Sequence, residues 1–67
     1  MKLDDVIALA RKNIGGAMES SARLCIDDAE RLQAQGNLDY AKVRAVKSLG
    51  YSVGIFHNDY QQAVKED

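Results

Sequence analysis

The sequence predicts an all-α fold, and three observations support this prediction. The chain of 67 residues contains no proline, the residue that most often ends a helix. Ala, Leu, Lys, Arg, Glu and Gln are abundant, and all six are strong helix formers. Apolar residues recur at steps of three and four, which is the period of an amphipathic helix. We therefore expect an antiparallel helical hairpin with a short C-terminal helix, in a single domain over residues 1–67.

The first predicted helix covers about residues 3–35 and contains a glycine pair. Gly15-Gly16 lies between two apolar series that remain in phase, because the eleven residues from Ile7 to Met18 make close to three turns. Each glycine costs a helix about 1 kcal/mol relative to alanine, so a break at this pair is the alternative. The apolar series are Leu3, Ile7, Ala10 and Ile14, then Met18, Ala22, Cys25, Ala29 and Leu32.

A turn at Gln35-Gly36-Asn37 separates the first helix from the second. Gly36 suits the left-handed position after a helix end, and Asn37 is a favourable N-cap. The second helix is predicted over about 38–56. Its apolar seam is Val43, Val46, either Leu49 or Gly50, Val53 and Phe56.

The last predicted helix is short and covers about residues 59–65. Asn58 and Gln61 have the spacing of a capping box, which predicts a kink or break near His57-Asn58. Tyr60 and Ala63 continue the apolar stepping of the second helix beyond this point.

The glycines are interpreted as sites of close helix packing. Pairing about the turn at Gly36 places Phe56 and His57 opposite Gly16 and Ala17, so large side chains face small ones. A phosphate-binding loop would require a preceding strand and a G-x-G-x-x-G pattern, which the sequence lacks. The predicted close-packing positions are Gly15, Gly16, Gly50 and Gly54.

More apolar surface is present than two helices can cover. A domain of this size buries only about 60% of the surface of its unfolded chain and usually requires a further stabilising link. The single cysteine cannot form an internal disulfide, and one His with one Cys cannot complete a zinc site. We therefore expect a homodimer resembling a four-helix bundle and no cofactor. The predicted protein interface is Tyr51, Ile55, Phe56, Tyr60, Leu9 and Leu24, with Val6 and Ser48 on the same off-seam strips.

Part of the hairpin resembles one tetratricopeptide repeat. The matching positions lie in residues 25–49 and have small residues, a large apolar residue and a turn glycine at repeat-like spacing. They are Cys25, Ala29, Leu32, Gly36, Leu38, Ala41, Ala45, Ser48 and Leu49. The resemblance implies a protein-interaction module, and because a single repeat cannot bury its own face, it also implies self-association.

Few residues point to catalysis, and no catalytic residue is predicted. His57, with Asp59 and Tyr60, is the one conceivable general acid–base group, and a small enzyme using His57 is an alternative function. A histidine without a cluster is more often a structural residue. Cys25 lies on the apolar seam far from His57, where a cysteine acts as a small hydrophobic residue.

Charge gives a second alternative, a nucleic-acid-binding accessory protein. Lys42, Arg44 and Lys47 make the start of the second helix locally basic. The formal net charge is −1, and no aromatic platform accompanies these cations, so nucleic acid is not the expected partner. Acidic residues are interpreted as surface pairs at i,i+4 spacing, Glu19 with Arg23 and Asp27 with Arg31.

No apolar run approaches the roughly 20 residues of a membrane span. The N-terminus has acidic residues where a signal peptide has basic ones, and with the lone thiol this predicts a cytoplasmic protein. The expected function is a non-catalytic interaction or regulatory module that acts as a homodimer and docks on another protein.

Overall fold

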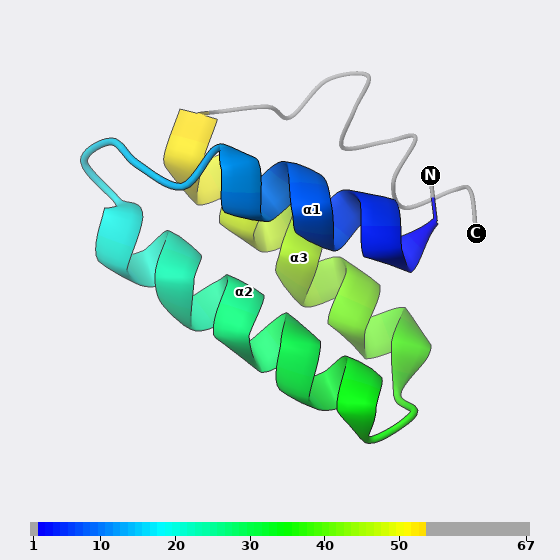
Figure 1. Cartoon of the computed structure of the whole chain (residues 1–67). Helices are drawn as coiled ribbons and strands as arrows, with labels where there is room; N and C mark the ends of the chain where they lie inside the picture. Colours follow the sequence, from blue (N-terminus) through cyan, green and yellow to red (C-terminus); the bar gives the residue numbers. More distant parts are fainter. Residues whose placement is uncertain (1, 54–67) are drawn as a thin grey trace.

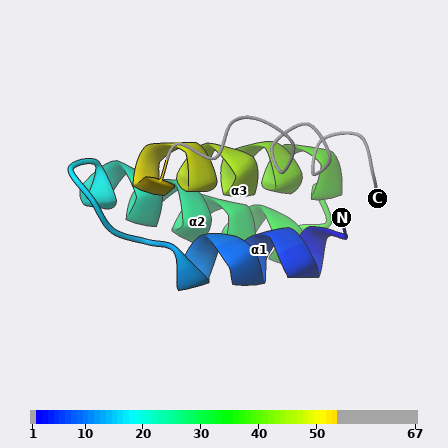
Figure 2. The ribbon, with the colours of Figure 1, turned by 90° about the horizontal axis from the view of Figure 1, so that it is seen from above.

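Three α-helices form the part of the chain, residues 2–53, that the computed structural model describes (Figure 1). They are α1 (Leu3–Lys12), α2 (Glu19–Ala34) and α3 (Leu38–Val53). α2 and α3 form an antiparallel hairpin, and α1 lies on one side of it (Figure 2). The all-α prediction is confirmed for these residues. The predicted end of the second helix beyond Val53 and the short helix over about 59–65 lie outside them.

The prediction of one continuous helix over about 3–35 is wrong, and the alternative, a break at the glycine pair, is observed. α1 ends at Lys12, where the Asn13 side-chain amide donates to the Leu9 carbonyl over 2.8 Å. Gly16 then adopts φ +79°, a conformation that an α-helix cannot contain. The break lets α1 turn back over the hairpin and bury Val6, which was assigned to a surface strip. α1 thus covers part of the apolar surface that the sequence predicted to lie in an interface.

Close backbone contact fixes the connection between α1 and α2. A Cβ atom added to Gly16 would lie 2.9 Å from the Ser52 carbonyl oxygen, closer than carbon and oxygen normally approach. The predicted neighbours of Gly16, Phe56 and His57, lie outside the described residues. Within them, Gly16 approaches the Ser52 backbone because residues 13–18 leave the helix.

Replacing Gly16 with alanine is expected to lower the free energy of unfolding by about 2–3 kcal/mol, as measured by urea denaturation. Left-handed backbone costs an alanine about 1–2 kcal/mol, and displacement of the Ser52 carbonyl adds to this cost. Gly36→Ala is the matched control, because Gly36 has φ +83° but nothing within 4 Å of an added Cβ. If the two variants lost the same free energy of unfolding, the close approach of Gly16 to Ser52 would contribute nothing to the cost of the substitution.

The turn between α2 and α3 is the predicted one. The Gly36 N–H donates to the Gln33 carbonyl, and the Asn37 N–H donates to the Leu32 carbonyl, both over 3.0 Å. With positive φ at Gly36, this pair of bonds is a Schellman motif. It ends α2 and returns the chain directly into α3.

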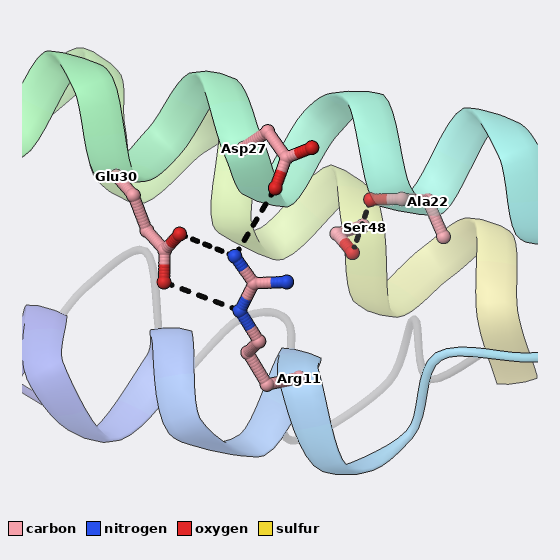
Figure 3. Close-up of polar contacts among 5 residues, drawn as sticks. All are labelled: Arg11, Ala22, Asp27, Glu30 and Ser48. Carbon is pink, nitrogen blue, oxygen red and sulfur yellow. Dashed lines mark hydrogen bonds and ion pairs between the residues drawn. The ribbon is translucent and has the colours of Figure 1, made fainter.

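Small residues separate the two helices of the hairpin. Four fully buried alanines lie on the facing sides of α2 and α3, and they let the two backbones approach closely. Ser48, predicted to lie on a surface strip, is also fully buried, and its hydroxyl donates to the Ala22 carbonyl over 2.9 Å (Figure 3). The alanines are Ala22, Ala29, Ala41 and Ala45.

The core lies where all three helices meet. The predicted seam is confirmed at Ile7, Ala10, Val46 and Leu49, which are buried. It is wrong at Met18, which lies in the connection before α2 and is exposed. It is also wrong at Val43, because α1 and α2 approach α3 from two other sides. The central cluster is Val6, Ile7, Ala10, Ile26, Ala29, Ala45, Val46 and Leu49.

Within residues 2–53, none of the helices has the length and apolar content needed to cross a membrane.

Candidate interaction surface

Large apolar side chains are exposed on the hairpin, on the sides of α2 and α3 that point away from the core. Leu24 is 70% exposed, Tyr40 50%, Val43 42% and Tyr51 40%. Tyr40 and Tyr51 are eleven residues apart, close to three helical turns, so they lie on one flank of α3 with Val43 between them. We call these four residues the outer face.

Charged residues line an open groove between α2 and α3 beside the outer face. Arg44 Nε on α3 lies 3.0 Å from Asp28 Oδ2 on α2, as an ion pair rather than an aligned hydrogen bond. Arg31 also pairs with Asp28. The groove has a volume of about 560 Å³, and Leu24 and Asp27 complete its lining.

Helical spacing places apolar residues on both sides of this ion pair. Leu24 precedes Asp28 by four residues, so both lie on the same flank of α2. Tyr40 lies four residues before Arg44, and Tyr51 lies seven residues after it, so all three lie on the same flank of α3. The Arg44–Asp28 pair is therefore bordered by exposed apolar side chains, an arrangement typical of a protein interface, where aromatic residues and arginine are enriched.

A separate set of ion pairs ties α1 to α2 (Figure 3). Arg11 on α1 donates to both carboxylate oxygens of Glu30 on α2, from Nε to Oε2 over 3.2 Å and from Nη2 to Oε1. Its Nη2 also donates to Asp27 Oδ1 over 3.1 Å. The hydrogen bonds to Glu30, followed by that to Asp27, raise the pKa of the Arg11 guanidinium above its ordinary value. Gln33 adds a bond of 2.6 Å to Asp4. These groups link α1 to α2 and include none of the four outer-face residues.

Comparisons with protein families, curated proteins and solved structures find no match to this chain.

The predicted interface residues are divided by the structure. Leu24 and Tyr51 are exposed and belong to the outer face. Leu9 is half-buried and packs against the core, because α1 folds back on the hairpin. Ile55, Phe56 and Tyr60 lie outside the described residues.

Two outer-face residues, Tyr40 and Val43, were missed from the sequence. Their spacing from Tyr51 is a signal that could have found them. Val43 was instead assigned to the core seam, because its three-residue step to Val46 fits a hairpin that lacks a third helix.

The four glycines predicted for close packing have different roles. Gly16 is the site of close approach, at the Ser52 backbone. Among the described residues, no atom lies within 4 Å of a Cβ added to Gly15. Gly50 is buried within α3, and Gly54 lies outside the described residues.

The basic residues of α3 do not share one exposed surface. Lys42 is 8% exposed, and Arg44 is engaged with Asp28. Lys47 is exposed. Of the surface pairs, Glu19 with Arg23 is confirmed at 3.0 Å, whereas Asp27 pairs with Arg11 and Arg31 pairs with Asp28.

Cys25 is a buried free thiol, as expected of a core position. His57 lies outside the described residues. Among residues 2–53, no group of three or more His, Cys, Asp and Glu side chains could hold a metal ion.

Proposed function

We propose that this chain is a non-catalytic protein–protein interaction module that acts as a homodimer through the outer face. Two α2–α3 hairpins meeting through these faces would form a four-helix bundle, with each α1 on the outside. The observation that carries the proposal is the group of four large apolar side chains exposed around the Arg44–Asp28 pair. A small chain with this much apolar surface on one side gains free energy by burying it.

Two further features are in keeping with this function. The hairpin resembles one tetratricopeptide repeat over residues 25–49, and such repeats bury their faces against neighbouring repeats. The free thiol of Cys25 suits a reducing, cytoplasmic setting. A second protein would dock on the same face, either in place of the second copy or beside it.

The variant Leu24→Ser with Tyr51→Ser is expected to weaken self-association by about 30-fold or more. Truncating a central interface anchor typically costs about 2 kcal/mol or more, and each 1.4 kcal/mol corresponds to about tenfold in Kd. Sedimentation equilibrium should give the wild type twice the 7.4 kDa chain mass and the variant a single chain mass at the same concentration.

Met18→Ser is the matched control, because Met18 is 47% exposed but lies in the connection before α2. It should associate like the wild type. Circular dichroism should show equal helix content in all three proteins. A wild type that stays monomeric at millimolar concentration would contradict the proposal, as would a double variant that still dimerises.

A further inference from the structure

The two helices beside the outer face present opposite charges. Between Tyr40 and Tyr51, α3 contains lysine and arginine but no acidic residue. Lys47 is exposed there, and within residues 2–53 it forms no ion pair. On α2, the side chain of Asp27 is 67% exposed although it pairs with Arg11. A surface with a cation on one helix and an anion on the other can complement a second copy of itself.

Lys47 and Asp27 lie at opposite edges of this side of the hairpin. Arg44 and Asp28 point towards each other across the groove. Lys47 follows Arg44 by three residues, which turns it about 60° away from α2. Asp27 precedes Asp28 by one residue, which turns it about 100° towards α1, where Arg11 bonds to it. The cation and the carboxylate therefore do not meet within one chain.

The antiparallel register nevertheless places the two residues at nearly the same level along the hairpin. Two contacts between α2 and α3 fix this register, and they are Ser48 with Ala22 and Arg44 with Asp28. Leu24, which lies between these contacts on α2, is therefore level with Lys47 on α3. Asp27 is less than one turn further along α2.

We propose that two copies of the chain pair about a two-fold axis parallel to their helices, with α2 of each copy lying on α3 of the other. This inference rests on the proposed homodimer and specifies its arrangement. Rotation about such an axis keeps every residue at its own level, so Lys47 reaches the partner's Asp27 at each edge of the interface. The partner's Leu24 then enters the space between Val43 and Tyr51, which lie four residues on either side of Lys47.

The other two-fold arrangement places α3 on α3 and α2 on α2. Because Leu24 and Lys47 share a level, contact between the two copies of Leu24 would bring the two copies of Lys47 together. Like charges that meet across an interface weaken binding, and this stretch of α3 contains no acidic residue to offset them. Charge complementarity therefore favours the arrangement with α2 on α3.

Lys47→Glu is expected to weaken the dimer about tenfold or more at low salt, because the two-fold axis makes two attractive contacts repulsive. Adding Asp27→Lys in the same chain should return the Kd to within about threefold of the wild-type value. Lys12→Glu is the matched control, because it makes the same charge change at the exposed end of α1, and it should alter the Kd by less than about threefold. Analytical ultracentrifugation gives the Kd values, and circular dichroism should show equal helix content in all four proteins.

Mixing wild type with the Lys47→Glu variant separates the two arrangements. Förster transfer between N-terminally labelled chains measures the Kd of the mixed dimer. With α2 on α3, one of the two ion pairs survives in the mixed dimer, so its Kd should fall between those of the two homodimers. With α3 on α3, the lysine would meet the introduced glutamate, and the mixed dimer should be the tightest of the three.

Three results would overturn this arrangement and leave the homodimer standing. They are a mixed dimer tighter than the wild type, a Lys47→Glu variant that dimerises as tightly as the wild type, and a failure of Asp27→Lys to restore binding. A wild type that stays monomeric would overturn both the arrangement and the proposed function.

Discussion

Leu49→Ala is expected to lower the free energy of unfolding by about 3–4 kcal/mol. Leu49 is fully buried on α3 in the central cluster, and truncating a buried leucine to alanine costs about 2–5 kcal/mol. At about 0.05–0.15 kcal/mol per residue, the whole domain is stable by only about 3–10 kcal/mol. The variant should therefore lose at least about a third of the stability of the domain.

Urea unfolding followed by circular dichroism measures this loss. Leu24→Ala is the matched control, because the same substitution at a side chain 70% exposed should change stability by no more than about 0.5 kcal/mol. Both proteins should be measured at a concentration low enough to keep the wild type monomeric, so that association adds nothing. Similar losses at Leu49 and Leu24 would contradict the core described here.

Ala45→Leu is expected to be nearly as damaging, although it adds apolar volume. Ala45 is fully buried where α3 faces α2, with Ala29 in the same cluster. Extra methyl groups in a well-packed core typically cost 1–3 kcal/mol, and here we expect about 3 kcal/mol, because the added side chain must push two backbones apart. That movement would also stretch the bond of 2.9 Å from Ser48 to the Ala22 carbonyl.

Thermal unfolding should show this loss as a fall in midpoint of more than 10 °C, at about 4–8 °C per kcal/mol for a domain of this size. Ala8→Leu adds the same group at an exposed position of α1 and should leave the midpoint nearly unchanged. A stabilised Ala45→Leu variant would mean that the two helices are less closely packed than the structure shows.

The hairpin could be predicted from the sequence because its signals are local. Gly36 and Asn37 are residue types that favour such a turn. The three- and four-residue steps between Ala22, Cys25 and Ala29 identify the buried side of α2. These features depend on backbone conformation and helix period, which neighbouring residues largely determine.

The course of α1 could not be predicted in the same way. The apolar steps from Ile7 to Met18 fit a straight helix as well as a broken one, and the cost of two glycines is too small to decide between them. The break is fixed by a contact distant in sequence, between Gly16 and Ser52. Because that contact was invisible, Val6 and Leu9 were assigned to an interface, and Tyr40 and Val43 were not recognised as exposed.

The placement of α1 also has a kinetic consequence. α2 and α3 are joined by the short turn at Gly36, whereas α1 must meet α3 across the whole length of α2. Local contacts form early in folding and distant ones late, so the hairpin should assemble first and α1 should dock after the rate-limiting barrier. Weakening α1, for example at Val6, should then accelerate unfolding while leaving the rate of folding almost unchanged.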